Sequence, residues 1–99
     1  MRLFVDDTRK FPEQGYECCR DVKYAKIFLD IIQFDHISLD YSLSGDETGM
    51  DILVYMHENN IFVPHINIHS NNIIGKERMQ RYCEEHFPNT KVTMIMLPK

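Results

Sequence analysis

The chain has 99 residues, of which 43% are hydrophobic and 26% are charged, and its formal net charge is -4. This length suits one folded domain, and the composition excludes an intrinsically disordered chain. A mildly acidic chain is also a poor candidate for binding duplex DNA, because a basic surface provides most of that affinity. We therefore expect a single domain over residues 1–99, with a modest stability that a homodimer could supplement.

The sequence shows no pattern that directs a protein into a membrane. Asp6 and Asp7 come too early for a signal peptide, and no apolar run approaches the roughly 18 residues that a membrane helix needs. Cys18, Cys19 and Cys83 give neither a disulfide framework nor the spacing of a zinc site. We expect a cytoplasmic protein without a membrane partner.

The first half of the chain predicts three strands and one helix. An apolar run over residues 3–5 ends at two aspartates, and a loop containing Pro12 and Gly15 follows. The spacing of apolar residues then predicts a helix that Asp21 caps and that continues to about residue 33. The strands predicted in this half cover residues 3–5, 16–20 and 36–39, and the last of them ends at Asp40.

The second half predicts two helices and two strands. After a polar loop over residues 41–48, apolar residues at helical spacing predict a helix over residues 49–60. Pro64 ends that segment, and a strand over residues 66–68 leads to His69 and Ser70. Asn71 or Asn72 can cap a helix that continues to about His86, and the last strand is predicted over residues 92–97.

Strands that alternate with helices are typical of a wound, mostly parallel α/β sheet. The connection between the first two strands is the exception, because a parallel crossover usually needs a dozen or more residues. We therefore predict a five-stranded α/β sheet in which the first crossover helix is missing.

Three aspartates follow two of the predicted strands directly. In an open parallel sheet ligands bind beyond the carboxyl ends of the strands, so Asp6, Asp7 and Asp40 are expected to converge there. A hard cation such as Mg²⁺ or Mn²⁺ would relieve the repulsion between these carboxylates. The alternative is that each aspartate only caps a helix or begins a turn.

A second group of polar residues surrounds the start of the third predicted helix. Ser70 and Asn72 precede the helix, whose N–H groups and positive dipole attract phosphate, and Lys76 adds charge in its first turns. Arg9 follows the acidic pair and could hold a phosphate group through two hydrogen bonds. His69 could transfer protons near neutral pH, or it could be a structural residue held by hydrogen bonds.

Taken together, these motifs resemble the response-regulator receiver fold, and most closely its divergent branch of cyclic-phosphate processing receiver-like domains. The resemblance rests on four motifs in order, which span residues 3–79. They are Asp-Asp-x-Arg at residues 6–9, Ser-Leu-Asp at residues 38–40, Thr-Gly at residues 48–49 and His-Ser-x-Asn-x-x-Gly-x-x-x-Met at residues 69–79.

The resemblance implies a three-layer, flavodoxin-like domain and a role for each matching residue. Asp6 and Asp7 match the metal-binding acidic pair, Asp40 the phosphate-accepting aspartate, and Ser70 the hydroxyl residue that senses the phosphoryl group. The backbone carbonyl of Ser42 matches a further Mg²⁺ contact of receivers. The chain departs from ordinary receivers in the missing helix, in the lack of room for a final helix and in the receiver lysine, for which only Lys99 after Pro98 is available.

Three functions remain open at this point. The first is metal-dependent binding or hydrolysis of a small cyclic phosphate, such as a cyclic nucleotide or an RNA 2′,3′-cyclic end, with Asp40 and His69 as catalytic residues. The second is a signalling receiver that is phosphorylated on Asp40. The third is a non-catalytic module that binds a partner protein and performs no chemistry.

Overall fold

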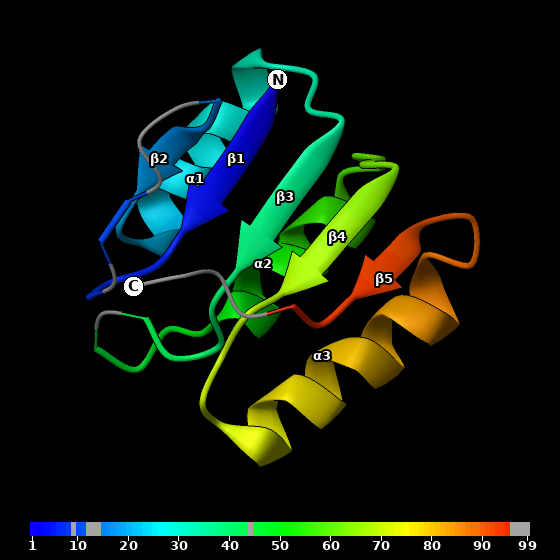
Figure 1. Cartoon of the computed structure of the whole chain (residues 1–99). Coiled ribbons are helices and arrows are strands. Elements are labelled where there is room, and N and C mark those ends of the chain that lie inside the picture. Colours follow the sequence, from blue (N-terminus) through cyan, green and yellow to red (C-terminus); the bar gives the residue numbers. More distant parts are fainter. Residues whose placement is uncertain (9, 12–14, 44, 96–99) are drawn as a thin grey trace.

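The computed structural model describes residues 1–8, 10–11, 15–43 and 45–95 of the chain. They form a five-stranded sheet in which every neighbouring pair of strands is parallel, in the order β2-β1-β3-β4-β5 (Figure 1). The predicted receiver-like α/β fold is confirmed. The strands are β1 (Arg2–Val5), β2 (Glu17–Cys19), β3 (His36–Leu39), β4 (His65–Ile68) and β5 (Lys91–Thr93).

The register of the three central strands brings their carboxyl ends level with one another. Val5 of β1 lies opposite Leu39 of β3, and Leu39 lies opposite Ile68 of β4. The ladder continues one residue further, because the N–H of Asp40 donates to the carbonyl oxygen of Val5. The residues that follow these strands therefore begin at one level of one sheet edge.

Each helix begins at a side chain that accepts hydrogen bonds from its first turn. Asp21 caps α1 (Val22–Ile31) as predicted, and Asn72 caps α3 (Ile73–His86). Thr48 begins α2 (Gly49–Glu58) with a capping box, in which Asp51 bonds back to the N–H of Thr48. These caps satisfy N–H groups that have no partner within a helix.

Two helices end earlier than the sequence predicted. After α1, the backbone at Ile32 is already extended, and the side chain of Gln33 donates to the carbonyl oxygen of Phe62. After α2, Asn60 has a φ of 55°, a left-handed conformation that ends a right-handed helix.

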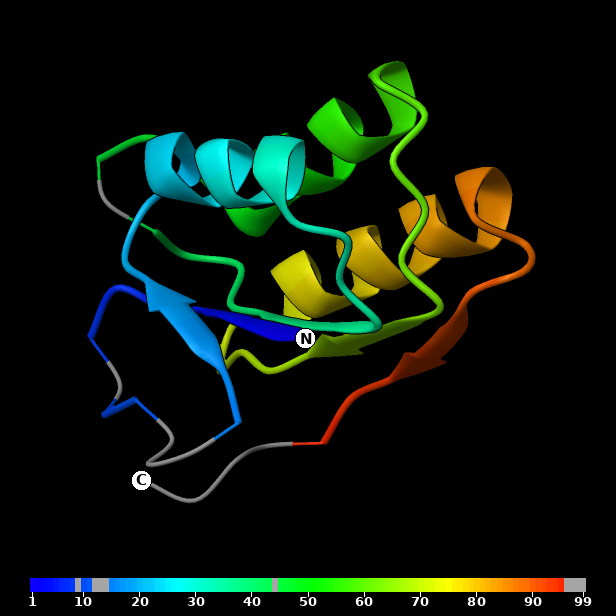
Figure 2. The same cartoon turned by 90° about the horizontal axis from the view of Figure 1, so that it is seen from above.

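All three helices pack on the same face of the sheet (Figure 2). The steps from β2 to β3, from β3 to β4 and from β4 to β5 run in one direction across the sheet. Because parallel crossovers are right-handed, such steps place their helices on one side. Leu3, Val5, Ile37 and Ile66 belong to the buried cluster beneath these helices.

The step from β1 to β2 runs the opposite way, so its connection lies on the other face. None of its described residues, 6–8, 10–11 and 15–16, is helical, in agreement with the predicted loss of the first crossover helix. The rings of Phe11 and Tyr16 pack edge-on against Phe4 of β1 instead. A flavodoxin-like domain has a layer of helices on this face as well. Among the described residues, side chains of the loop cover it instead, and no helix lies there.

The last strand is shorter than predicted. β5 ends at Thr93, whereas the prediction extended to residue 97. The side chain of Asn67 bonds to both the N–H and the carbonyl oxygen of Ile95, and so occupies the backbone groups that a further strand pair would use. Residues 96–97, like Pro98 and Lys99, lie outside the described residues.

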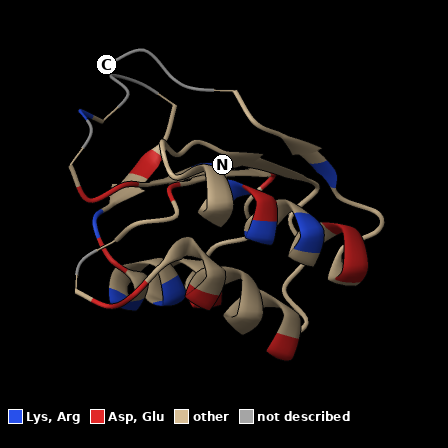
Figure 3. Ribbon diagram, turned by 90° about the horizontal axis from the view of Figure 1, so that it is seen from below, with Lys and Arg blue, Asp and Glu red and all other residues tan. Residues whose placement is uncertain are grey.

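Two further surface properties bear on the predicted partners. Basic and acidic side chains occur together on α1 and on α3, so neither helix presents a purely basic surface (Figure 3). No helix among the described residues is long and apolar enough to cross a membrane.

Candidate functional site

The three predicted metal ligands lie together beyond the carboxyl edge of the sheet. Asp6 and Asp7 follow β1, Asp40 follows β3, and one carboxylate oxygen of each lies within 4.8 Å of the others. Asp6 is 1% exposed, whereas Asp7 and Asp40 are partly exposed. The sequence therefore located this cluster correctly, and two of its acids can be reached from solvent.

A cavity of about 510 Å³ opens over this cluster. Its described walls come from the loops after β1, β3 and β4, and no aliphatic side chain is among them. They are Asp6, Asp7, Thr8, Lys10, Asp40, Ser42, Ser70, Asn71 and Asn72. A cavity with this lining suits a small, charged and hydrated ligand.

Asp6 and Asp7 raise the proton affinity of Asp40. The pKa of Asp40 is raised to about 6, first because burial disfavours its charged form, and then because the charge of Asp6 lies close to it. Asp7 adds a smaller increase, and a hydrogen bond from Ser70 opposes the shift. The negative charges of Asp6 and Asp7 therefore repel that of Asp40, and a bound cation would relieve this repulsion.

The start of α3 forms the opposite wall of the cavity. The Ser70 hydroxyl accepts a hydrogen bond from the N–H of Asn72 at 3.1 Å, and Oδ1 of Asn72 accepts one from the N–H of Gly75 at 2.8 Å. Ser70 is thus held between the helix start and Asp40. Ser70 and Asn72, two of the four residues predicted to surround a phosphate, therefore line the same cavity as the acidic cluster.

Tyr41 connects the Asp40 loop with α3. Its ring packs on Gly75, where a Cβ atom would collide with it, and its hydroxyl accepts a hydrogen bond from Arg78 at 3.0 Å. The N–H of Gly49 in turn donates to the carbonyl oxygen of Tyr41 at 2.8 Å. Gly75 therefore allows the close approach that keeps Asp40 beside the helix start.

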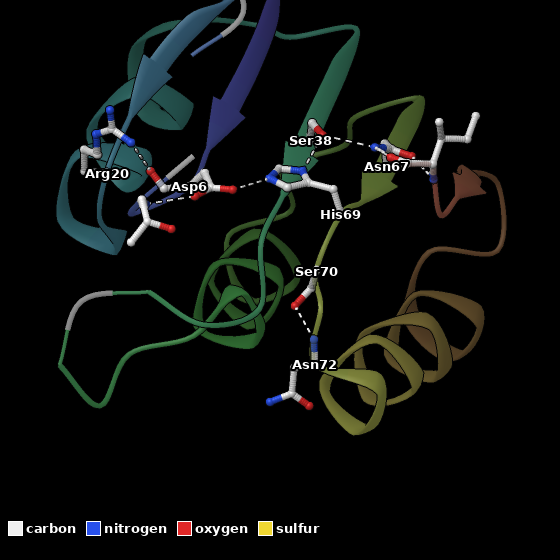
Figure 4. A network of polar contacts seen from close by, with 9 residues as sticks. Asp6, Arg20, Ser38, Asn67, His69, Ser70 and Asn72 are labelled. Atoms are coloured by element: carbon white, nitrogen blue, oxygen red, sulfur yellow. Dashed lines mark hydrogen bonds and ion pairs between the residues drawn. The ribbon is translucent and has the colours of Figure 1, made fainter. Parts of the chain in front are cut away.

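His69 lies behind the cluster and does not line the cavity. Its side chain is fully buried, its ring is stacked on Phe4, and Nε2 lies 2.9 Å from Oδ2 of Asp6 (Figure 4). Nδ1 lies 2.7 Å from the Ser38 hydroxyl. With both nitrogens engaged inside the protein, His69 is placed to orient Asp6 and is badly placed to exchange a proton with a ligand.

Neither of the two basic residues predicted to bind phosphate is seen to line the cavity in the part of the chain that the structure describes. Lys76 lies in the first turns of α3, but it is not among the described residues that line the cavity. Arg9 lies outside the described residues. Lys10 and Thr8 do line the cavity, although they were not among the predicted site residues. Both lie within three residues of the acidic pair, after β1, and this position was the signal that could have identified them.

A parallel sheet with this strand order and an acidic, hydroxyl-lined carboxyl edge defines a receiver-like module. The family model of the cyclic-phosphate processing receiver domain matches residues 1–85, and the chain belongs to this family. No curated protein and no solved structure matches the chain significantly.

Proposed function

We propose that this domain binds a small cyclic phosphate together with Mg²⁺ or Mn²⁺ and hydrolyses it at the carboxyl edge of the sheet. The observation that carries the proposal is one cavity shared by three clustered carboxylates and the polar start of α3. The family to which the chain belongs supports the choice of a cyclic phosphate. A cyclic nucleotide or an RNA 2′,3′-cyclic end is the ligand class that we would test first.

The donor set fits a hard divalent cation. Asp6, Asp7 and Asp40 offer only oxygen atoms, and Mg²⁺ binds through one or two carboxylates together with water and phosphate oxygens. Ser42 also lines the cavity, and the resemblance to receivers implies that its backbone carbonyl would contact the cation. The raised pKa of Asp40 supports the same assignment, because a cation at this place would lower the cost of ionising Asp40.

The groups on the other wall are suited to hold the phosphate. In the proposed complex Ser70 and Asn72 orient phosphate oxygens, and the dipole of α3 favours negative charge at that end. Lys10 supplies positive charge from the facing loop. Arg9 and Lys76 remain predicted phosphate ligands, Arg9 because it follows the acidic pair and Lys76 because of its place on α3.

Opening a cyclic phosphate adds water to phosphorus and breaks one ester bond, and the released oxygen takes up a proton. Asp40 is the half-buried carboxylate that can accept the proton of that water or attack phosphorus itself. A divalent cation would supply polarisation of the phosphoryl oxygens. In this scheme His69 holds Asp6 in place, which replaces the proton-transfer role that the sequence suggested.

One observation favours phosphorylation of Asp40 as a second candidate function. Ser70 lies close enough to Asp40 to oppose the rise in its pKa, which places a hydroxyl beside the matching aspartate, as expected for a receiver that senses its phosphoryl group. In that case the domain would be a signalling module, and a kinase or a small phosphodonor would be its partner. A partner-binding module without chemistry is the third possibility. A homodimer, a cytoplasmic location and the absence of duplex DNA and membrane partners also remain predictions.

Phosphorus NMR separates these functions. The protein with Mg²⁺ would be incubated with 2′,3′-cyclic nucleotides and, separately, with acetyl phosphate. Asp40→Asn tests the site, and Asp30→Asn, at an exposed position of α1, is the matched control. We expect the ring to open with the wild type and Asp30→Asn, and not with Asp40→Asn.

Each other result identifies a different function. An acyl-phosphate signal that needs Asp40, without ring opening, would replace hydrolysis with the signalling receiver. Silence with both compounds would contradict both chemical functions and leave the partner-binding module.

A further inference from the structure

A buried row of hydrogen bonds crosses the face of the sheet that no described helix covers. It runs from Asn67 of β4 through Ser38 of β3 and His69 to Asp6 (Figure 4). The donor–acceptor distances are 3.1, 2.7 and 2.9 Å, and all four side chains are at most 4% exposed. Three strands thus contribute to the position of one candidate metal ligand.

The backbone of Ile95 determines which atom donates and which accepts in this row of hydrogen bonds. Its N–H can only donate, and it lies 2.9 Å from Oδ1 of Asn67, whereas its carbonyl oxygen can only accept, and it lies 2.8 Å from Nδ2. The amide of Asn67 therefore has one orientation. Its second Nδ2 hydrogen points to the Ser38 hydroxyl.

The Ser38 hydroxyl in turn determines which ring nitrogen of His69 carries the proton. Its oxygen accepts from Asn67, and among the described residues Nδ1 of His69 is the one acceptor within reach of its own hydrogen, so the hydroxyl donates to Nδ1. A neutral imidazole that accepts at Nδ1 carries its proton on Nε2. Nε2 then donates to Oδ2 of Asp6, as its 2.9 Å separation allows.

The other oxygen of Asp6 is held as well. Oδ1 accepts a hydrogen bond from the N–H of Thr8 at 2.9 Å. Each carboxylate oxygen has two lone pairs, so neither of these two hydrogen bonds by itself excludes a cation from Asp6. The two bonds together fix the plane of the carboxylate that faces Asp7 and Asp40.

We propose that Ser38, oriented by Asn67, is a positioning residue of the metal site that holds His69 as the Nε2–H tautomer and thereby keeps Asp6 in its ligating orientation. This inference rests on the proposed metal-dependent function. Hydrogen-bond partners behind metal ligands typically change metal affinity by about 10- to 100-fold when they are removed. Ser38 and Asn67 touch neither the ligand nor the metal in this arrangement.

The first part of the test needs only the metal-free wild-type protein. Nitrogen-15 NMR distinguishes protonated from unprotonated imidazole nitrogens. For His69 we expect a protonated Nε2 and an unprotonated Nδ1 that accepts a hydrogen bond. A protonated Nδ1 in the folded wild type would overturn the proposal, whatever the protein binds.

The second part compares two variants that each lose one hydroxyl from this face. Ser38→Ala removes the donor to Nδ1, whereas Thr93→Val removes a hydroxyl that donates to Oδ1 of Asn67 at 2.7 Å. Because the Ile95 backbone still orients the amide, Thr93→Val should leave the His69 signals and the Mn²⁺ affinity near wild-type values. Ser38→Ala should shift the Nδ1 signal toward that of an imidazole nitrogen without a hydrogen bond and weaken Mn²⁺ binding about tenfold or more.

The outcomes separate this proposal from the proposed function. If the wild type binds no Mn²⁺, the metal-dependent function fails, while the nitrogen spectrum still tests the tautomer. If the wild type binds Mn²⁺ and Ser38→Ala binds it equally tightly, the positioning role alone is overturned. The same holds if Thr93→Val weakens binding as much as Ser38→Ala does.

Discussion

Nε2 of His69 lies 2.9 Å from Oδ2 of Asp6, and both side chains are buried. Replacing His69 with alanine removes this donor and leaves a cavity beside Phe4. We expect the free energy of unfolding to fall by about 3 kcal/mol, from the lost hydrogen bond to a buried charged group and the lost packing. Urea unfolding measures this change. His86→Ala, on a partly exposed part of α3, is the control, and equal losses in both variants would contradict the structural role of the buried pair.

Asp40 is expected to destabilise the metal-free protein. Its pKa in the folded state is raised to about 6, so between its ordinary pKa and about pH 6 the folded state binds more protons than the unfolded state. Stability therefore falls as the pH rises through that window. Two pKa units correspond to about 2.7 kcal/mol, and partial exposure reduces the expected effect to about 1 kcal/mol.

The test of this effect is thermal unfolding of Asp40→Asn in EDTA. The variant should be more stable than the wild type at pH 7, and the difference should shrink toward pH 4. A variant that is less stable than the wild type at pH 7 would contradict the repulsion that we infer among the three acids.

Gly75 is expected to tolerate no side chain while Tyr41 packs on it. A Cβ atom at this position would collide with the tyrosine ring, so Gly75→Ala should cost about 1 to 2 kcal/mol through overpacking and should shift the Asp40 loop. Tyr41→Ala in the same chain should relieve that collision. Chemical unfolding of both single variants and the double variant measures the coupling energy. If the losses in the free energy of unfolding were strictly additive, the two residues would not be coupled, which would contradict the predicted collision.

His36 is expected to remain neutral well below pH 6.5. Its pKa is lowered to about 4, first because burial disfavours the charged form and then because His65 and Arg2 are close, while Asp35 opposes the shift. Nδ1 of His36 lies 2.9 Å from Nδ1 of His65, and the Tyr16 hydroxyl lies 3.5 Å from Nε2. Two protonated rings could not keep the contact between the histidines.

Between pH 6.5 and about 4 the unfolded state therefore binds the extra proton, and His36 makes stability fall as the pH falls. An NMR titration of the ring signals gives the midpoint directly. A midpoint near 6.5 would show that burial and His65 do not affect this residue as described. In His36→Gln the contribution to the pH dependence should disappear.

The sequence was sufficient to locate the acidic cluster, because each acid follows an apolar strand directly and the ends of parallel strands meet at one edge. It was not sufficient for His69. Val5 and Ile68 both face the helices, so the residues that follow them, Asp6 and His69, share the opposite face. The alternation of side chains along a strand predicts that Asp6 and His69 share a face. It predicts their contact only when β3 is already known to lie between β1 and β4.

The arrangement of layers could not be predicted from the local pattern either. Right-handed crossovers put all three helices on one face only once the strand order is known, and that order depends on contacts between distant segments. The end of β5 had a similar cause, because the side chain of Asn67 holds the backbone of Ile95. Both features arise from tertiary contacts, which the hydrophobic periodicity of the sequence does not reveal.

The most direct measurement is a calorimetric titration of the metal-free protein with Mn²⁺. We expect one site in the wild type and in the exposed control Asp30→Asn, and a loss of measurable binding in Asp7→Asn and Asp40→Asn, each of which removes one of three clustered carboxylates. Thermal stability should rise with metal concentration in the same two proteins that bind, by about 2.7 kcal/mol at a hundred times the dissociation constant. No binding by the wild type, or equal binding by all four proteins, would contradict a metal site at Asp6, Asp7 and Asp40.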